Sequence, residues 1–116
     1  MPAALSLVID CRDPETLALF WTQALGYTNV GLYGSYAVLV DPDNASPRLL
    51  LQRVSEPKPG KNRVHFDVHV ADVHAEAARL ESLGAVRGET LNEFGTDWVV
   101  MADPEGNEFC VCSSDA

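Results

Sequence analysis

The sequence is short of basic residues, cysteine and long apolar runs, and each shortage narrows the classes of function open to it. Lysine and arginine number 8 against 17 aspartates and glutamates, and the net charge of -9 disfavours binding to nucleic acid or to anionic membranes. The 3 cysteines are an odd number, which is typical of reduced thiols and not of a secreted disulfide framework. We therefore expect a small-molecule or protein partner.

The sequence also leads us to expect no membrane or export segment. No run of about 18 apolar residues occurs, and the opening MPAALSLVID lacks the basic region and the long apolar stretch of a signal peptide. With 116 residues, of which 47% are hydrophobic, the chain can form one domain with a modest core. These features predict a soluble cytoplasmic protein.

An internal repeat is the most informative feature of the chain. Leu25-Gly26 and Leu83-Gly84 each end a helical pattern, half a chain length apart. Asp41-Pro42 in the first half is matched by Asp103-Pro104 in the second, and each pair lies between two apolar runs. The chain therefore looks duplicated.

Both halves show the element order β-α-β-β-β. In the first half, Asp13-Pro14-Glu15 supplies an N-cap, a proline at the first helical position and an acidic first turn, and Gly26 ends the helix. Leu17, Phe20 and Trp21 give this helix an apolar stripe, so we expect them in the core. The strands are expected at Leu5–Asp10, Tyr27–Leu32, Tyr36–Asp41 and Arg48–Val54.

The second half repeats the pattern after a linker rich in proline and glycine at about residues 56–62. Its helix is expected to run from an Asp72 cap to Gly84, with His74 exposed near the start. Its strands are expected at Arg63–Val70, Ala85–Leu91, Asp97–Ala102 and Glu108–Cys112. The chain is thus predicted to be one α+β domain, with module one at about residues 1–55 and module two at about 63–116.

The first strand of the second half, RVHFDVHV, alternates polar and apolar residues. On a strand, His65, Asp67 and His69 share one face, while Val64, Phe66, Val68 and Val70 share the other. Two imidazoles and a carboxylate are possible metal ligands, but residues two apart on a strand lie about 7 Å from each other, so all three should not reach one ion. Cys110 and Cys112 likewise share a strand face.

The motifs DPETLALFWTQALGY, QRVSEPKPGKNRVHFDV and WVVMADPEGNEFCVC, on a duplicated chain of this length, resemble the vicinal oxygen chelate superfamily. This group includes glyoxalases, bleomycin resistance proteins and dioxygenases, and the resemblance is to its glyoxalase-like branch. It implies two tandem βαβββ modules that form an open eight-stranded curved sheet with a central cleft and with the helices outside. It also implies a homodimer.

The resemblance further implies which positions would hold a divalent metal. Metal-dependent relatives place a histidine or glutamate on the first and fourth strand of each module. The matching residues here are expected to be Ser6, Gln52, His65 and Cys110. Only His65 is of the usual ligand type, so no metal cofactor is expected; if one binds, His65, Cys110 and Gln52 are the candidate ligands.

These departures also bear on the reaction. Glyoxalase I chemistry needs a carboxylate base and a metal that holds the enediolate, and Gln52 and Cys110 replace the residues that would supply them. We therefore do not expect glyoxalase I activity. His65 and Asp67 are the candidate catalytic residues, with Asp67 as acid or base or as the group that orients His65.

The cysteine beside His65 has two interpretations. Cys110 and His65 could form a thiolate–imidazolium pair or part of a zinc site, or Cys110 could be a buried thiol beside a histidine. Gln52, Cys110, Trp98 and Tyr36 are the candidate ligand-binding residues, and aromatic side chains there could stack on a flat ligand.

The sequence thus predicts a cleft for a small organic molecule, with lyase or isomerase chemistry as one function. The alternative is a non-catalytic protein that sequesters a small molecule, similar to the bleomycin resistance type.

Overall fold

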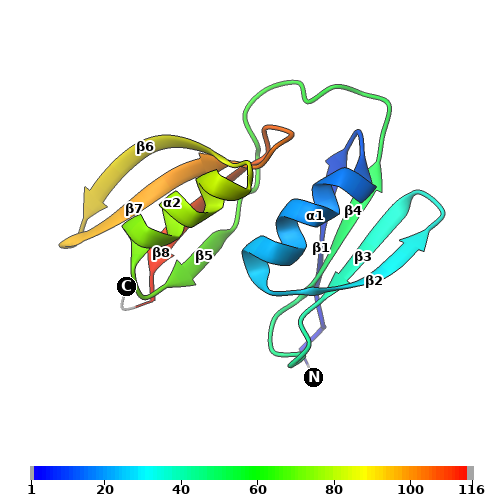
Figure 1. Ribbon diagram of the computed structural model, residues 1–116, viewed down its shortest axis with the longest axis horizontal. Coiled ribbons are helices and arrows are strands. Elements are labelled where there is room, and N and C mark those ends of the chain that lie inside the picture. Colours follow the sequence, from blue (N-terminus) through cyan, green and yellow to red (C-terminus); the bar gives the residue numbers. More distant parts are fainter. Residues whose placement is uncertain (1, 115–116) are drawn as a thin grey trace. The chain divides into compact units, whose positions relative to one another are not determined.

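A computed structural model describes residues 2–114, which fall into two compact units divided between Pro57 and Lys58 (Figure 1). This division lies in the segment predicted as a linker, where the described chain forms neither helix nor strand from residue 54 to residue 66. Each unit has its own helix and its own sheet. Neither helix in the described part of the chain is long and apolar enough to cross a membrane.

The first unit is a βαβββ module. Its elements are β1 (Ser6–Cys11), α1 (Pro14–Leu25), β2 (Thr28–Tyr33), β3 (Tyr36–Val40) and β4 (Arg48–Arg53). The strands form a sheet of order β1-β4-β3-β2, in which β1 pairs parallel with β4 and the other neighbours pair antiparallel.

The second unit repeats this arrangement. Its elements are β5 (Asp67–Val70), α2 (Val73–Leu83), β6 (Val86–Glu93), β7 (Thr96–Ala102) and β8 (Glu108–Ser113). The sheet order β5-β8-β7-β6 is equivalent to that of the first unit, again with one parallel pair, β5 and β8. The predicted pair of βαβββ modules is confirmed.

Both helices begin and end where the sequence predicts. The Asp13 carboxylate accepts a hydrogen bond from the Thr16 amide at 3.2 Å, and the Asp72 carboxylate accepts one from the Ala75 amide at 3.1 Å. Gly26 and Gly84 end the helices in the left-handed region, with φ of 70° and 119°. The two modules therefore also share the residues that cap their helices, an aspartate at the start and a glycine at the end.

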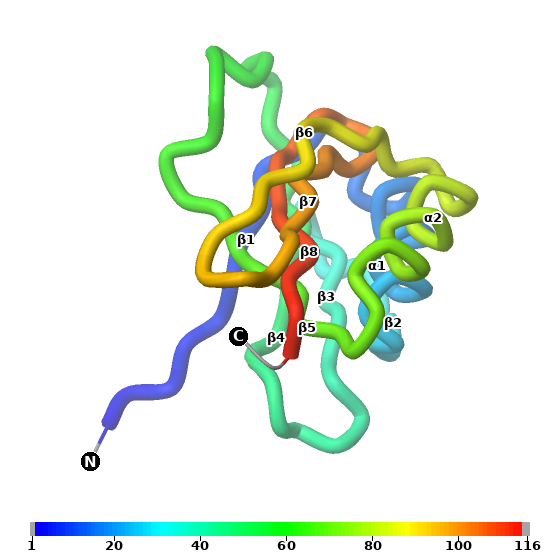
Figure 2. Tube along the Cα trace, turned by 90° about the vertical axis from the view of Figure 1, so that its left-hand side faces the viewer, coloured from blue at the N-terminus to red at the C-terminus, as the bar shows by residue number. Residues whose placement is uncertain are grey.

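Each helix covers one face of its own sheet, and the cores lie between them. Phe20 and Trp21 are 3% and 1% exposed, which confirms their predicted core role. In the second unit α2 contacts β7 and β8, and Leu80 of the helix is buried, as are Met101, Phe109 and Val111 of the sheet, all 1% exposed or less. Figure 2 shows the two layers of this unit, with β5, β7 and β8 on one side and α2 on the other.

The repeated Asp-Pro turns have a shared construction. The Asp41 carboxylate accepts hydrogen bonds from three backbone amides of its turn, and Asp103 accepts from the amides of Glu105 and Asn107. Hydrogen bonds of this kind lower the pKa of Asp41, led by the one from the Asp43 amide. Asp103 is 1% exposed, so its hydrogen bonds compensate for burial of a charged group.

The first strand of the second unit is shorter than predicted. It begins at Asp67 and not at Arg63, and Val64 is 82% exposed instead of facing the helix. Phe66 keeps its expected side because its ring stacks on Phe109, with ring centroids 6.4 Å apart, and its carbonyl accepts from the Cys110 amide. In the described structure, the residues before Phe66 form no backbone hydrogen bond of this kind with β8. For this reason β5 begins later than predicted.

Candidate functional site

A pocket of about 540 Å³ lies on the sheet of the second unit, on the face opposite α2. Because successive side chains of a strand point to opposite faces of the sheet, every second residue of each strand can line the pocket. Phe109 and Val111 of β8 are buried on the helix side, whereas their neighbours Cys110 and Cys112 line the pocket. The prediction that both cysteines share one strand face is therefore confirmed, and that face lines the pocket.

Asp67 and Cys110 lie side by side on the parallel strands β5 and β8, where they are register partners. Cys110 is 7% exposed, while the Asp67 side chain is 45% exposed. The next pocket-facing pair along these strands is His69 and Cys112. The parallel register thus brings one carboxylate, one imidazole and two thiols to the same wall.

His65 precedes β5 and still reaches this wall. Its Nε2 lies 3.6 Å from Asp67 Oδ1, and its side chain is half exposed. One nitrogen of His65, one oxygen of Asp67 and the sulfur of Cys110 all lie within 4.8 Å of one another. The predicted catalytic pair and one predicted ligand-binding residue therefore meet in a single cluster.

His69 is oriented differently. Its Nδ1 lies 3.3 Å from the Ser113 carbonyl oxygen, a contact to the end of β8. Among the described residues, the His65, Asp67 and Cys110 cluster does not include His69. This agrees with the expectation that the three polar residues of RVHFDVHV do not reach one ion.

The two pocket cysteines are protonated near neutral pH. Burial raises the pKa of Cys110, the Asp67 carboxylate raises it further, and Lys61 acts in the opposite sense. For Cys112, burial and then Asp67 raise the pKa to about 11, and the thiol donates a hydrogen bond to that carboxylate. Of the two interpretations of Cys110, this favours the buried thiol beside a histidine over the thiolate–imidazolium pair.

Apolar and aromatic side chains form the rest of the pocket. Leu91, Trp98 and Val100 come from β6 and β7, and Phe94 comes from the hairpin tip between these strands. Phe94 is 97% exposed, and its φ of 54° places it in the left-handed region at the hairpin tip. The sequence indicated Trp98 as a candidate for stacking but did not single out Leu91 or Val100. For Val100 a signal was available, because it alternates with Val99 and Met101, which are buried on the other face of β7.

Hydrogen bonds and an ion pair hold the segment before β5 against Glu108 at the edge of the pocket. Glu108 accepts a hydrogen bond from the Asn62 amide at 3.1 Å and pairs with Lys58 at 3.2 Å. The Asn62 side chain also donates to the Glu108 carbonyl at 3.0 Å. Lys61 lies between these residues in sequence and lines the pocket, so part of the predicted linker contributes to the site.

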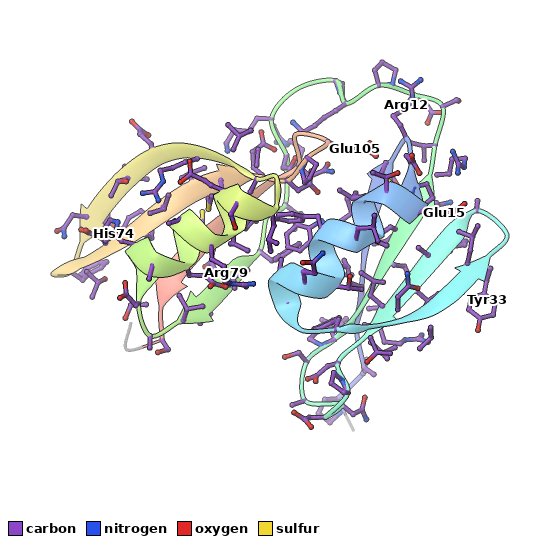
Figure 3. All side chains as sticks on the ribbon, viewed as in Figure 1. Arg12, Glu15, Tyr33, His74, Arg79 and Glu105 are labelled. Carbon is purple, nitrogen blue, oxygen red and sulfur yellow. The ribbon has the colours of Figure 1, made fainter. Side chains whose placement is uncertain are left out.

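His74 is exposed, as predicted, but it has a partner. Its Nε2 lies 2.7 Å from Asp97 Oδ2, which joins the start of α2 to the start of β7. Of this pair, His74 is labelled in Figure 3. The side-chain Nδ2 of Asn92 donates to the other oxygen of Asp97 at 2.8 Å. Asn92 first and His74 second lower the pKa of Asp97, so this pocket carboxylate is held ionised.

Tyr36 and Gln52, the other predicted ligand-binding residues, belong to the first unit. They are register partners on β3 and β4. Trp98 and Cys112 are register partners on β7 and β8 in the same way. Tyr36 and Gln52 are thus the counterparts of Trp98 and Cys112, and their role in ligand binding stays a prediction.

The pairing of β1 with β4 and of β5 with β8 corrects one of the expected matches between residues of the two modules. Val8 and Asp67 stand at the same distance before their helix caps, and their register partners are Leu50 and Cys110. The counterpart of Cys110 is therefore Leu50, whereas the sequence comparison had matched Cys110 with Gln52. Ser6 and His65 remain counterparts by the same count.

With Ser6 and Leu50 at the first unit's positions, the residues do not fit the metal site of metal-dependent relatives. A serine hydroxyl is a weak neutral ligand and leucine has no donor atom, so neither can supply the charged oxygen ligands that such a site uses. No reaction step is therefore assigned to a metal held at those positions.

Comparison with known families agrees with the repeated module. The sequence profile of the glyoxalase-like domain matches residues 6–112, which is nearly the whole chain. The protein belongs to the glyoxalase-like domain family. No curated protein matches this glyoxalase-like chain by sequence.

Solved structures share the fold of this glyoxalase-like protein at low sequence identity. A glyoxalase/bleomycin resistance protein/dioxygenase family enzyme from Burkholderia phytofirmans PsJN has a TM-score of 0.81 at 18% identity, over 96% of this chain and 98% of that one. A variant of the fosfomycin resistance protein FosX from Listeria monocytogenes, in complex with Mn(II) and 1S,2S-dihydroxypropylphosphonic acid, has a TM-score of 0.78 at 13% identity, over 97% and 91%.

A third similar structure is the hypothetical protein SA1046 from S. aureus, with a TM-score of 0.76 at 15% identity, over 97% of this chain and 94% of that one. Together with the family profile, the Burkholderia enzyme and FosX confirm the predicted vicinal oxygen chelate fold. At these identities they show the fold alone, because one scaffold serves many chemistries.

Proposed function

We propose that the second unit of this glyoxalase-like protein binds a small organic molecule in the pocket opposite α2. One observation supports this most directly: a pocket of about 540 Å³ combines an apolar wall with a compact polar cluster. Small-molecule sites typically have about 300–1,000 Å³ and a few polar groups that orient the ligand. Leu91, Trp98 and Val100 would contact the apolar part, and His65 and Asp67 the polar part.

Charge narrows the class of ligand. Besides its histidines, the pocket is lined by one lysine and four carboxylates, which are Lys61, Asp67, Glu93, Asp97 and Glu108. An anion would be repelled by this excess of negative charge, so we expect a neutral or cationic ligand. In this respect the pocket is unsuited to a phosphonic acid such as the ligand in the FosX complex.

The aromatic residues favour a flat ligand. Trp98 is half-buried on β7, and Phe94 is exposed at the adjoining hairpin tip. Stacking on such rings contributes about 0.5–1.5 kcal/mol beyond the burial of area, and cations gain further from the ring face. The proposed ligand is therefore an aromatic or other planar molecule, neutral or positively charged.

Catalysis by proton transfer is a second candidate function. It is favoured by the 3.6 Å distance between His65 Nε2 and Asp67 Oδ1 at the pocket wall. In a lyase or isomerase reaction, one of these groups would remove a proton from the bound molecule while the other orients or charges its neighbour. Sequestration without turnover, as in proteins of the bleomycin resistance type, uses the same pocket and needs no such step.

The experiment uses three probes of matched shape: 2-naphthylmethylamine as a cation, 2-naphthalenemethanol as a neutral molecule and 2-naphthoate as an anion. Isothermal titration of the full chain should give saturable binding of the amine or the alcohol, with the naphthoate weakest. Trp98→Ala should weaken this binding by about 3- to 10-fold, in line with one lost stacking contact.

Tyr33→Ala is the matched control, because Tyr33 is an exposed aromatic residue at the corresponding hairpin of the first unit (Figure 3). It should leave the affinity unchanged. Equal binding of all three probes, or equal losses in the Trp98 and Tyr33 variants, would contradict the proposal.

We also propose that the protein is a cytoplasmic homodimer, on the basis of its composition and its family. Sedimentation equilibrium of the purified chain would test the dimer directly, and a monomer at all concentrations would contradict it.

A further inference from the structure

The hairpin between β6 and β7 turns through two residues, Phe94 and Gly95, and both have positive φ angles, 54° and 78°. Tight hairpins of this kind favour asparagine or glycine, because most side chains are strained in the left-handed region. Among the described residues, the other side chain with a positive φ belongs to Asn44, a residue type that tolerates this region. Phenylalanine at this turn therefore destabilises the fold.

The first module shows which residue suits such a turn. Its hairpin between β2 and β3 also turns through two residues, and Gly34 stands at the position of Phe94, with a φ of 61°. The Phe94 side chain is 97% exposed, so packing against the rest of the described chain does not offset the strain. Strained residues persist where they serve a function. Because Phe94 lines the pocket, the function to which the strain points is ligand binding.

We propose that Phe94 is a specificity-determining residue, whose ring covers the far end of an elongated planar ligand. The length assigned to this ligand rests on the proposed binding of a small organic molecule in the same pocket. Its polar end lies at the cluster of His65 and Asp67, and its other end lies under the hairpin tip.

Strand register gives the length. Asp67 stands level with Val100 of β7, because both pair with Cys110. The hairpin turns just beyond Thr96, four residues away from Val100 on the same strand, and Trp98 lies midway. Because four residues of a strand span about 13 Å, a molecule that meets both ends has about the length of three fused rings with a polar substituent.

The test compares two amines with the same head group, 2-naphthylmethylamine and the longer 2-anthracenylmethylamine, by fluorescence titration of the full chain. The wild type should bind the longer amine more tightly. Phe94→Asn should weaken binding of the longer amine by about 3- to 10-fold, as for one lost stacking contact, and leave that of the shorter amine unchanged. Phe94→Tyr keeps an aromatic ring at the tip and should retain both affinities.

Unfolding in urea without ligand tests the strain. Phe94→Asn should lower the equilibrium constant for unfolding by about 3- to 10-fold, because asparagine tolerates the left-handed region better than phenylalanine. Gly34→Phe is the reciprocal change in the first module, where an added Cβ would meet nothing within 4 Å. It should destabilise the fold through the backbone conformation alone.

The outcomes distinguish the role of Phe94 from the proposed function. If the wild type binds neither amine, both are overturned. If both amines bind, and Phe94→Asn binds the longer one as tightly as the wild type does, the role of Phe94 alone is overturned. A Phe94→Asn variant that is less stable than the wild type would also contradict this role, because the ring would then serve the fold.

Discussion

Asp67 and Cys110 are register partners across the parallel strands β5 and β8, with a carboxylate at the pocket wall beside a thiol that is 7% exposed. Parallel pairing of the first and last strand of the module produces this contact between residues far apart in the sequence. The carboxylate affects both pocket thiols, and His65 approaches it from the chain before β5. Asp67 is therefore the residue whose replacement should have the widest effect.

Asp67→Asn should make the pocket thiols more reactive. The pKa of Cys112 is raised to about 11, mainly by burial of the thiol and secondly by the charge of the Asp67 carboxylate. Removing its charge lowers the pKa of the thiol, so a larger fraction is thiolate at any pH below that value. The rate of alkylation by iodoacetamide, followed by mass spectrometry between pH 7 and about 10, should rise at Cys112 and Cys110.

His69→Gln is the control for this measurement, because His69 shares the strand and the pocket but is not among the causes of either shift. An alkylation profile of Asp67→Asn that coincides with that of the wild type would contradict the assigned effect of the carboxylate.

Asp103→Ala should destabilise the second unit by about 1–3 kcal/mol, the cost of leaving buried hydrogen-bonding groups without their partner. Asp103 is 1% exposed and accepts from the amides of Glu105 and Asn107 and from the Asn107 side chain. The free energy of unfolding in urea measures the loss. The more exposed Asp41 offers the comparison, and Asp41→Ala should cost less.

Glyoxalase I turnover is not expected, even with added metal. The positions that match the relatives' ligands hold Ser6, Leu50, His65 and Cys110, so no carboxylate stands where that reaction places its base. The assay is formation of lactoylglutathione from methylglyoxal and glutathione in the presence of Zn²⁺, Ni²⁺ or Mn²⁺. Turnover in the wild type that is lost in Asp67→Asn would show that this carboxylate serves as the base after all.

Tyr36→Ala and Gln52→Ala test whether the first unit takes part in binding. These residues are the counterparts of Trp98 and Cys112, and both were predicted to contact the ligand. If they do, each should weaken binding of 2-naphthylmethylamine by about 3- to 10-fold, as for one lost aromatic or polar contact. Affinities equal to that of the wild type would confine the site to the second unit.

The faces of the strands were predictable because alternation of side chains follows from the backbone alone. Cys110, Cys112 and Trp98 line the pocket for this reason, and Phe109 and Val111 are buried. The helix ends were predictable from Asp13, Asp72 and their glycines, since capping is a local interaction.

Two features of the site could not be predicted from local sequence patterns. The start of β5 depends on contacts of Phe66 and Asn62 with residues of β8, which lie far along the chain. The counterpart of Cys110 depends on strand register, and the turn from Asp41 to Arg48 is longer than the turn from Asp103 to Glu108. The matching Asp-Pro motifs before these turns therefore do not give the correct alignment of β4 with β8 after them.

The most direct test of the central claim, that the second unit binds a planar neutral or cationic molecule, is the indole N–H region of a nitrogen-15 spectrum. The chain has 2 tryptophans: Trp98 lines the pocket, and Trp21 is 1% exposed in the core of the first unit. Titration with 2-naphthylmethylamine should shift the Trp98 signal to saturation, together with the amides of Cys110 and Cys112, and leave the Trp21 signal in place. A Trp98 signal that does not move, or equal shifts of both indoles, would contradict the claim.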